Sequence, residues 1–234
     1  MRLLLTRPQP EAGRTAAALL ARGHRVLIAP LMRIKPVEAD LAGTWTAVIV
    51  TSSNALRALT PAQRAALSAL PLFAVGQRSA ETAREAGFSD VRSAQGDARD
   101  LVRLVTARAA GAVAPMLYLA GEDRAFDLAG ELGKHDIGVR TVVVYRAIVT
   151  GFPPELIAAL ENGAIDAALH FSARSAANFL AGAKDAGLLG PALALRQFCL
   201  SAPVAEPLIA AGAKNITVAA RPDENALIEL TGRL

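Results

Sequence analysis

An internal repeat constrains the fold of this chain more than any other feature of its sequence. The segment FAVGQRSAETAREAGFSDV, which runs from Phe73 to Val91, aligns without a gap on FCLSAPVAEPLIAAGAKNI, which runs from Phe198 to Ile216. VIVTSSNAL likewise corresponds to ALHFSARSA, and RLLLTRP corresponds to MLYLAGED. The matched segments lie roughly 115 to 125 positions apart, which is too long for a solenoid repeat and about the size of one small domain. We therefore predict a duplicated protein with two related domains.

Each matched segment has a short apolar run ending in Ser, Thr or Gly and then an amphipathic stretch, so each predicts a strand leading into a helix. Short, nearly continuous apolar runs are typical of parallel strands that helices cover on both faces. We expect strands at Leu3 to Leu5, Val26 to Ala29, Ala47 to Val50, Leu72 to Val75, Met116 to Leu119, Val142 to Tyr145, Ala167 to Phe171, Phe198 to Leu200 and Ile216 to Ala219. We expect helices at Glu11 to Arg22, Ser79 to Ala86 and Phe126 to Gly133, and helix ends at Gly23, Gly87, Gly133 and Gly212. The predicted fold class is α/β, with two similar doubly wound parallel-sheet domains.

The composition narrows the class of protein. Hydrophobic residues make up 53% of the 234 positions, which favours ordered domains over a disordered chain. The single cysteine, Cys199, has no partner for an internal disulfide, which fits a reducing cytoplasm. The first apolar run ends at Thr6, and the longest uncharged stretch, from Leu41 to Leu56, is shorter than a membrane span. We therefore expect a soluble cytoplasmic protein that does not enter the membrane.

The charge distribution disfavours nucleic acid as a partner. The net charge is only +4 and aromatic residues make up 4% of the chain, which leaves little for stacking on bases. The arginines are interspersed with acidic residues such as Glu81, Glu85, Asp123 and Asp127. A modest positive excess of this kind suits an anionic small molecule.

Two connecting segments differ from the rest of the chain. Met32 to Pro36 and Tyr145 to Thr150 are extended, alternate in polarity and follow matching strands of the two repeats. They could pair as a two-stranded ladder between the domains. Such pairing would group the first strand-helix-strand with the C-terminal half and make one domain discontinuous. Two domains in simple tandem order are the alternative, and the residues alone leave both open.

Polar residues follow the predicted strands at the points where loops turn into helix N-termini. In an open parallel sheet, ligands bind beyond these carboxyl ends, where main-chain N–H groups are unpaired and helix dipoles favour anions. The candidate binding residues are Thr6, Arg7, Thr51, Ser52, Ser53, Asn54, Gly76, Gln77, Arg78, Gly121, Glu122, Ser172, Ala173, Arg174, Ser175 and Ser201. For each residue alone, capping of the next helix is the alternative interpretation. Repetition of the pattern at several strand ends favours binding, in a cleft between two facing domains.

The usual catalytic signatures are absent, because the sequence contains no GxGxxG, no phosphate-binding loop ending in GK[ST], no HExxH and no CxxC. His170 stands at a strand end, from which it could reach the cleft, but we expect it to be a buried, hydrogen-bonded strand residue. Cys199 lies within a strand-like run and is expected in the core. Tyr145 ends the run VVVY. Its phenol could donate a proton to a departing hydroxyl, or its ring could pack at the domain junction, and both interpretations stay open.

The segments LLLTRP, VIVTSSNAL, LPLFAVGQRSAETAREAGF, LYLAGED, VVVYRA, LHFSARSA and GAKNITVAARPDE together resemble the uroporphyrinogen-III synthase family over nearly the whole chain. No single motif carries this resemblance. Their order, their spacing and the duplication carry it. The resemblance implies a cytoplasmic lyase of tetrapyrrole biosynthesis that converts hydroxymethylbilane, a linear tetrapyrrole, to uroporphyrinogen III and water. It also implies that neither a metal nor an organic cofactor takes part.

The resemblance further implies two α/β domains joined by a two-stranded ladder. The expected boundaries are residues 1–33 with 150–234 for domain 1 and 37–147 for domain 2, with linkers at 32–36 and 146–150. The tyrosine most often discussed in the family falls on Tyr145. Many relatives carry a Gly-x-x-Thr-Ala turn in the second repeat, whereas this chain has Ser201, Ala202, Pro203, Val204 and Ala205. The threonine hydroxyl is missing, so that only backbone N–H groups remain as donors in this turn.

In the family's reaction scheme the terminal hydroxyl of the substrate leaves to give an azafulvene. The last ring then attacks through its substituted carbon to form a spiro intermediate, and fragmentation and reclosure invert that ring. The pyrroles supply the electrons, so the protein's expected task is to hold a folded substrate. Arg7, Arg78 and Arg174 are the cations best placed by sequence to meet carboxylates, with surface charges beside helix starts as the alternative.

Two other functions remain open at this point. One is a non-catalytic module of two lobes that binds an anionic metabolite by hinge closure. The other is a transferase with a nucleotide donor, although the chain offers no diphosphate loop. For the synthase that the resemblance implies, we expect a monomer.

Overall fold

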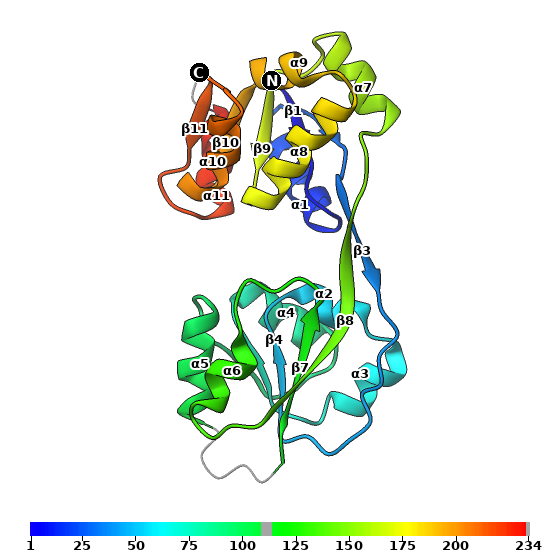
Figure 1. The fold of residues 1–234 in the computed structure, drawn as a ribbon, viewed down its shortest axis with the longest axis vertical. Coiled ribbons are helices and arrows are strands. Elements are labelled where there is room, and N and C mark those ends of the chain that lie inside the picture. Colours follow the sequence, from blue (N-terminus) through cyan, green and yellow to red (C-terminus); the bar gives the residue numbers. More distant parts are fainter. Residues whose placement is uncertain (109–113, 233–234) are drawn as a thin grey trace. The chain divides into compact units, whose positions relative to one another are not determined.

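The structure is a computed structural model that describes residues 1–108 and 114–232, and it divides into two compact units (Figure 1). Unit 1 combines Met1–Arg33 with the segment that begins at Ile148, and unit 2 consists of Ile34–Ala147. Unit 1 is therefore built from both ends of the chain, coloured blue and yellow to red in Figure 1.

Within the described residues, unit 1 has a five-stranded parallel sheet with the strand order β11-β10-β9-β1-β2. The strands are β1 (Arg2–Leu5), β2 (Arg25–Ile28), β9 (Ala167–His170), β10 (Arg196–Cys199) and β11 (Ile216–Val218). The helices are α1 (Glu11–Leu20), α7 (Pro154–Glu161), α8 (Ala173–Asp185), α9 (Leu189–Ala194), α10 (Ala202–Ala210) and α11 (Glu224–Glu229), followed by the 3-10 helix η1 (Leu230–Gly232). Leu4 packs on the face covered by α7, α8 and α9, whereas Leu3 and Leu5 pack on the face covered by α1 and α11. Because successive side chains of a strand point to opposite faces, helices on both faces require an unbroken apolar run.

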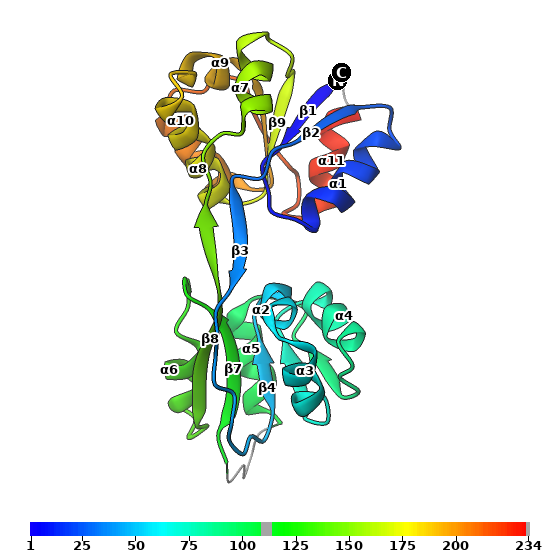
Figure 2. The same cartoon turned by 90° about the vertical axis from the view of Figure 1, so that its right-hand side faces the viewer.

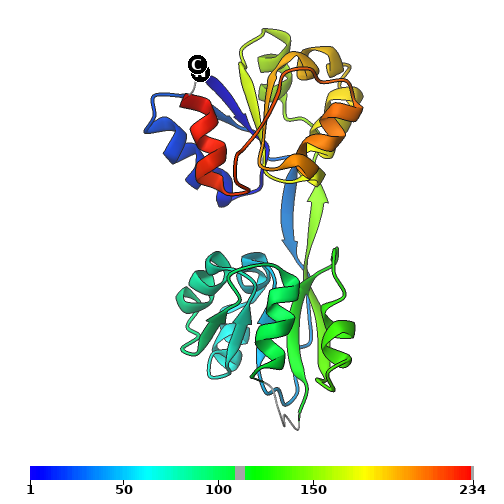
Figure 3. The same ribbon diagram turned by 90° about the vertical axis from the view of Figure 1, so that its left-hand side faces the viewer.

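Unit 2 has a sheet with the order β3-β8-β7-β4-β5-β6, in which β8 to β6 run parallel. The strands are β3 (Met32–Pro36), β4 (Val48–Val50), β5 (Leu72–Ala74), β6 (Val91–Ser93), β7 (Met116–Gly121) and β8 (Val139–Val149). The helices are α2 (Ser53–Ala58), α3 (Pro61–Leu67), α4 (Gln77–Glu85), α5 (Ala98–Thr106) and α6 (Leu128–Gly133). Figure 3 shows α5 and α6 together on one side of this sheet, where they pack on Ile49 and Phe73. Helices α2 and α4 pack on Val48 and Val50 from the other face.

The internal repeat is visible in the topology. The first matched segment forms β5-α4-β6 and the second forms β10-α10-β11. Gly87 and Gly212 occupy equivalent places after α4 and α10, with φ of 98° and 92°, a left-handed conformation that ends helices and favours glycine. The strand order β8-β7-β4-β5-β6 of unit 2 repeats the order β2-β1-β9-β10-β11 of unit 1. The predicted α/β fold class, with similar doubly wound parallel sheets, is confirmed.

Strands β3 and β8 pair as a ladder, and their arrows point in opposite directions in Figure 2. The Val37 amide donates to the Val144 carbonyl at 2.8 Å, and the Thr150 amide donates to the Leu31 carbonyl at 3.0 Å. As one residue number rises the other falls, so the pairing is antiparallel. The unit boundaries, after Arg33 and after Ala147, both fall within these two strands.

The structure adds detail to three local expectations. The expected strand Val142 to Tyr145 and the extended segment after it form one continuous strand, β8. The short strand β6 (Val91–Ser93) was not predicted, since three half-buried residues give too short a pattern. Helix α6 ends at Gly133, as predicted, and the left-handed residue that follows this helix is Asp136, with φ of 60°.

Candidate functional site

The strand order locates one topological switch point in each unit. In doubly wound sheets, ligands bind where two adjacent strands send their following helices to opposite faces. In unit 2 the adjacent strands are β4 and β7, followed by α2 and by α6 on opposite faces. In unit 1 they are β1 and β9, followed by α1 and α8. The predicted residues at these strand ends therefore include the two positions that the fold singles out.

Two hydroxyl groups meet at the switch point of unit 2. Thr51, the first residue after β4, lies with its Oγ1 2.9 Å from the Tyr118 hydroxyl of β7. The Tyr118 side chain is only 3% exposed. Burial raises the pKa of the Tyr118 phenol, and the nearby Tyr145 adds to the rise while the bond to Thr51 opposes it. Tyr118 therefore stays protonated and neutral at physiological pH.

The loop after Thr51 forms the N-terminus of α2. The Ser52 hydroxyl caps the helix by accepting the Asn54 amide at 3.2 Å. Ser53 is buried, and its hydroxyl accepts a hydrogen bond from Arg57 at 3.1 Å. Asn54 Oδ1 also faces the Arg57 guanidinium, at 3.5 Å. The side chains of Ser52, Ser53 and Asn54 thus interact within α2. Thr51 differs from them because its side chain bonds across to the neighbouring strand β7.

Tyr145 packs directly on Gly121, the last residue of β7. A Cβ atom added at Gly121 would lie 2.7 Å from Tyr145 Cζ and 2.8 Å from its hydroxyl oxygen. The strands are irregular at this point, since the register shifts between Ala120 and Gly121, and the Glu122 amide donates to the Tyr145 carbonyl at 3.0 Å. Arg124 donates to the Gly121 carbonyl at 3.0 Å and closes the turn. The structure therefore brings Tyr145, Gly121 and Glu122 together.

The two equivalent strand ends, after β5 and after β10, differ in the space and the backbone N–H donors that they present to a ligand. Gly76 precedes α4 with an extended backbone, and no atom lies within 4 Å of where its Cβ would be. Gln77 and Arg78 follow as exposed residues of the first turn. At the equivalent place, Ser201 precedes α10 without capping it, and Pro203 in the first turn has no N–H group. The expectation of several backbone donors after Ser201 is therefore weakened, because Val204 already donates to the Ser201 carbonyl.

Arg7 lies at the switch point of unit 1, where its interactions hold the loop. Its guanidinium stacks over the Phe171 ring at 4.0 Å, which links the ends of β1 and β9. The same group lies 3.2 Å from Glu224 Oε1 and 3.1 Å from the Thr15 hydroxyl. With 13% of its side chain exposed, Arg7 is a largely buried ion-pair partner. A structural role for Arg7 is thus visible, and its predicted role toward a ligand stays a prediction.

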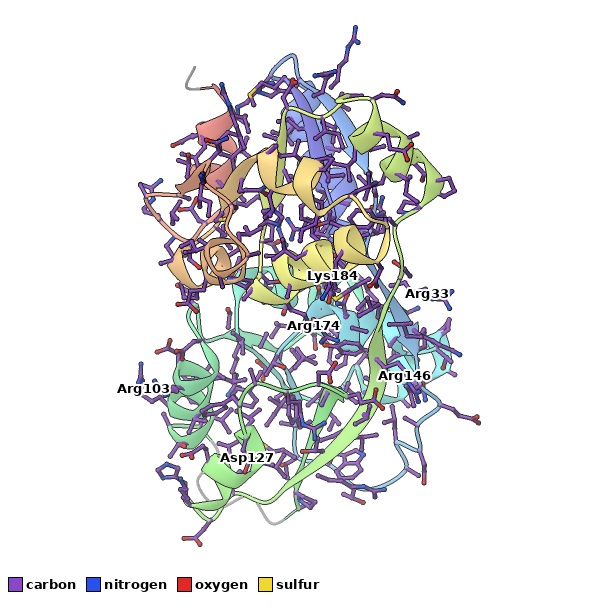
Figure 4. All side chains as sticks on the ribbon, turned by 45° about the horizontal axis from the view of Figure 1, so that its top comes forward. Arg33, Arg103, Asp127, Arg146, Arg174 and Lys184 are labelled. Carbon is purple, nitrogen blue, oxygen red and sulfur yellow. The ribbon has the colours of Figure 1, made fainter. Side chains whose placement is uncertain are left out.

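The loop after β9 repeats the serine-rich capping seen in unit 2. Ser172 caps α8 by accepting the Ser175 amide at 3.1 Å, and the buried Ser175 hydroxyl donates to the Ser172 carbonyl at 2.9 Å. Ala173 and Arg174 are exposed in the first turn, and Figure 4 labels Arg174 at this helix start.

His170 and Cys199 are core residues, as predicted. The His170 ring is fully buried, its Nε2 lies 2.8 Å from Gln197 Oε1, and its Nδ1 has no partner among the described residues. Gln197 uses its amide nitrogen to donate to the Ala192 carbonyl at 2.8 Å, so its oxygen accepts and the proton of neutral His170 sits on Nε2. Burial lowers the pKa of His170 to about 4 and raises the pKa of Cys199 to about 11. Neither group titrates near neutral pH.

Sequence reasoning missed Tyr118 and Arg124. Tyr118 lies inside an apolar strand, where an aromatic residue reads as core, and only its cross-strand bond to Thr51 distinguishes it. Arg124 comes shortly after the strand-end residues Gly121 and Glu122, and this closeness to the end of the strand could have marked it as a candidate site residue. A hollow of about 710 Å³ lies at the opposite, amino end of β10 and β11, beside Arg196 and Lys214, and is not part of this site.

Two other features are absent from the residues that the structure describes. No group of three or more His, Cys, Asp or Glu side chains is arranged to bind a metal ion. None of the helices described has the length and apolar character that crossing a bilayer requires.

The fold defines a class: α/β proteins of two duplicated, doubly wound units, each with a switch point at which polar strand-end loops form a candidate ligand-binding edge. The sequence profile of a family described as uroporphyrinogen-III synthase HemD matches residues 13–229. This match covers most of the chain, and the chain belongs to the uroporphyrinogen-III synthase family.

Solved structures with this name share the fold. Uroporphyrinogen-III synthetase from Helicobacter pylori superimposes with a TM-score of 0.68, over 99% of this chain and 98% of that chain, at 19% identity. A triple mutant of uroporphyrinogen III synthase from the extremely thermophilic bacterium Thermus thermophilus gives 0.56, over 100% and 98% of the two chains, at 18% identity. A comparison with curated proteins gave no significant match. The predicted family and enzyme class, a cyclising lyase, are confirmed by the family membership.

Proposed function

We propose that this chain cyclises hydroxymethylbilane to uroporphyrinogen III, with loss of water and inversion of the last pyrrole ring, and that its strand-end loops bind the substrate's carboxylates. Family membership supports the reaction. Two observations at the switch point of unit 2 carry the assignment of the site: Thr51, which follows β4, bonds to Tyr118, and Tyr145 packs on Gly121 at the end of the neighbouring strand β7. The proposal treats the two units as the domains 1–33 with 150–234 and 37–147, linked by residues 32–36 and 146–150.

Carboxylate binding follows from the donors at these edges. Main-chain N–H groups at the starts of α4 and α8 point along the helix axis toward the loops, and the helix dipole favours an anion there. Gly76 has no side chain to cap α4 or to obstruct a ligand. Arg78 and Arg174, both exposed in the first turns, add positive charge. Arg7, Gln77, Glu122, Ala173 and Ser201 complete the proposed contacts.

The chemistry needs a folded substrate more than a reactive side chain. In water the linear tetrapyrrole closes to the symmetrical isomer, so the enzyme must favour attack by the substituted carbon of the last ring. Holding that carbon near the reactive methylene can lower the barrier by several kcal/mol, up to about 7 to 11 kcal/mol in the best cases. Tyr145 donates a proton to the terminal hydroxyl of the substrate, so that this group departs as water.

Tyr145→Phe tests the proposed acid. Phenylalanine keeps the ring on Gly121 and the main-chain bond to Glu122 while it removes the hydroxyl. We expect kcat to fall about tenfold, below the usual range for general acids, because a phenol is a weak acid at neutral pH. Single-turnover rates and the isomer ratio measure this, with the melting temperature as the check on folding. Full activity with an unchanged isomer ratio would dismiss Tyr145 as the acid.

Incubation with hydroxymethylbilane separates the enzyme from a non-catalytic binding module. The inverted isomer, above the spontaneous background, means an enzyme. Formation of the symmetrical isomer alone, with the substrate bound, means a binding module. The proposal also includes a monomer in the cytoplasm that needs no nucleic acid, which the scattered charges and the single buried Cys199 support.

A further inference from the structure

We propose that Tyr118 is a positioning residue, which turns the Thr51 hydroxyl proton outward to bind a substrate carboxylate at the switch point of unit 2. This inference rests on the proposed function. Tyr118 itself does not touch the substrate, because its side chain is buried in the face covered by α5 and α6.

The number of protons on the two hydroxyls shows which of them donates the hydrogen bond. Thr51 and Tyr118 share one hydrogen bond at 2.9 Å, and neither hydroxyl has another partner among the described residues. One of the two protons is used in this bond, and the other has no acceptor within the described part of the protein. A spare proton on buried Tyr118 would be an unsatisfied donor in the core, which is costly. On half-buried Thr51 it can reach a ligand or water, so Tyr118 donates and Thr51 presents the free proton.

The place of Thr51 suits this role. Val50 pairs with Leu119 across β4 and β7, so the register continued by one residue sets Thr51 opposite Ala120. Ala120 is followed by Gly121, on which the Tyr145 ring lies. Thr51 thus lies at the strand edge that the fold reserves for ligands, one residue along β7 from the glycine on which Tyr145 packs. A hydroxyl that already accepts a bond from a phenol is also a better donor, because hydrogen bonds in a chain polarise one another.

Unit 1 provides an internal comparison. The repeat aligns Thr51 with Phe171, and the matching strand registers align Tyr118 with Leu5. Both equivalents are apolar, and Leu5 is fully buried in its own sheet. The fold therefore does not need a hydroxyl pair at this point, and the pair is specific to the unit that carries Tyr145.

A double-mutant cycle tests the inference. Thr51→Val removes the donor, and we expect KM for hydroxymethylbilane to rise about tenfold, which corresponds to one lost hydrogen bond to a charged group. Tyr118→Phe leaves Thr51 in place without its fixed orientation, and we expect KM to rise about fourfold with kcat nearly unchanged. Because Tyr118 acts only through Thr51, the double variant should match Thr51→Val alone. Thr51→Ser keeps the hydroxyl and should restore a KM near that of the wild type.

Two results would overturn the inference: a wild-type KM in Tyr118→Phe, or effects of the two substitutions that add in the double variant. Melting temperatures identify a variant that has lost its fold. If Tyr118→Phe fails to fold, Tyr118→Leu takes its place in the cycle, because unit 1 carries Leu5 at the equivalent position. Formation of the inverted isomer by the wild type separates the test of the proposed function from the test of the role of Tyr118. Without it the proposed function fails, and with it only the role of Tyr118 is at stake.

Discussion

Replacing Gly121 by alanine is expected to lower kcat about a hundredfold while the protein stays folded. The new Cβ would lie 2.7 Å from Tyr145 Cζ and 2.8 Å from its hydroxyl oxygen, closer than real Cβ contacts. Gly121 does not adopt a left-handed backbone conformation, so alanine strains no dihedral there and the conflict is purely steric. The atoms that must move belong to a side chain, and the Tyr145 ring is displaced while the strand remains. The expected loss exceeds that of Tyr145→Phe because the displaced ring misplaces the bound substrate as well as the hydroxyl, and a displacement of about 1 Å can cost a hundredfold in rate.

Single-turnover kinetics and the isomer ratio measure this effect. Gly133→Ala is the matched control, because Gly133 lies in α6 of the same unit and no atom lies within 4 Å of its Cβ position. It should leave kcat unchanged. Comparison with Tyr145→Phe separates the ring from its hydroxyl, since Tyr145→Phe keeps the ring in place. A Gly121→Ala variant with the rate and isomer ratio of the wild type would show that the position of the ring is irrelevant to catalysis.

The second large effect concerns stability against acid. The imidazole of His170 is fully buried, and its pKa is lowered from 6.5 to about 4 because burial penalises the charged form. Below pH 6.5 the unfolded chain binds a proton on His170 that the folded chain does not bind until about pH 4. The unfolding free energy therefore falls as the pH is lowered from 6.5 to 4. The expected contribution of His170 over this window is about 3 kcal/mol.

Urea denaturation at several pH values, with and without His170→Gln, measures this contribution. Taking the difference between the two proteins cancels the carboxylates and His24, whose pKa burial also lowers. The difference should shrink by about 3 kcal/mol between pH 6.5 and 4. His135→Gln is the control at an exposed histidine and should follow the wild type. Titration of the His170 ring by NMR gives a second test that needs no variant, and protonation near pH 6.5 in the folded protein would contradict the prediction.

The extent to which sequence predicted the site follows from how local each feature is. Strand ends and helix starts are local, so Thr51 to Asn54, Gly76 to Arg78 and Ser172 to Ser175 do lie where strands end and helices begin, as the sequence predicted. Capping is also local, and the structure gives Ser52 and Ser172 this role. Tyr145 was singled out by its place in the chain, but the reason for its position, the missing side chain at Gly121, came only from the structure.

The sequence by itself determined that this is a duplicated α/β protein of the uroporphyrinogen-III synthase family, because the apolar runs, the turns and the repeat are all patterns along the chain. Only the tertiary structure decided which side chains meet. Thr51 and Tyr118 are 67 positions apart, and His170 and Gln197 are 27 apart. Such contacts depend on which strands are neighbours and in what register, and these depend on the packing of the whole sheet. From the sequence, Tyr118 is therefore predicted to be a core residue, because it lies in an apolar strand. It becomes a candidate positioning residue only when the structure shows its hydrogen bond to Thr51.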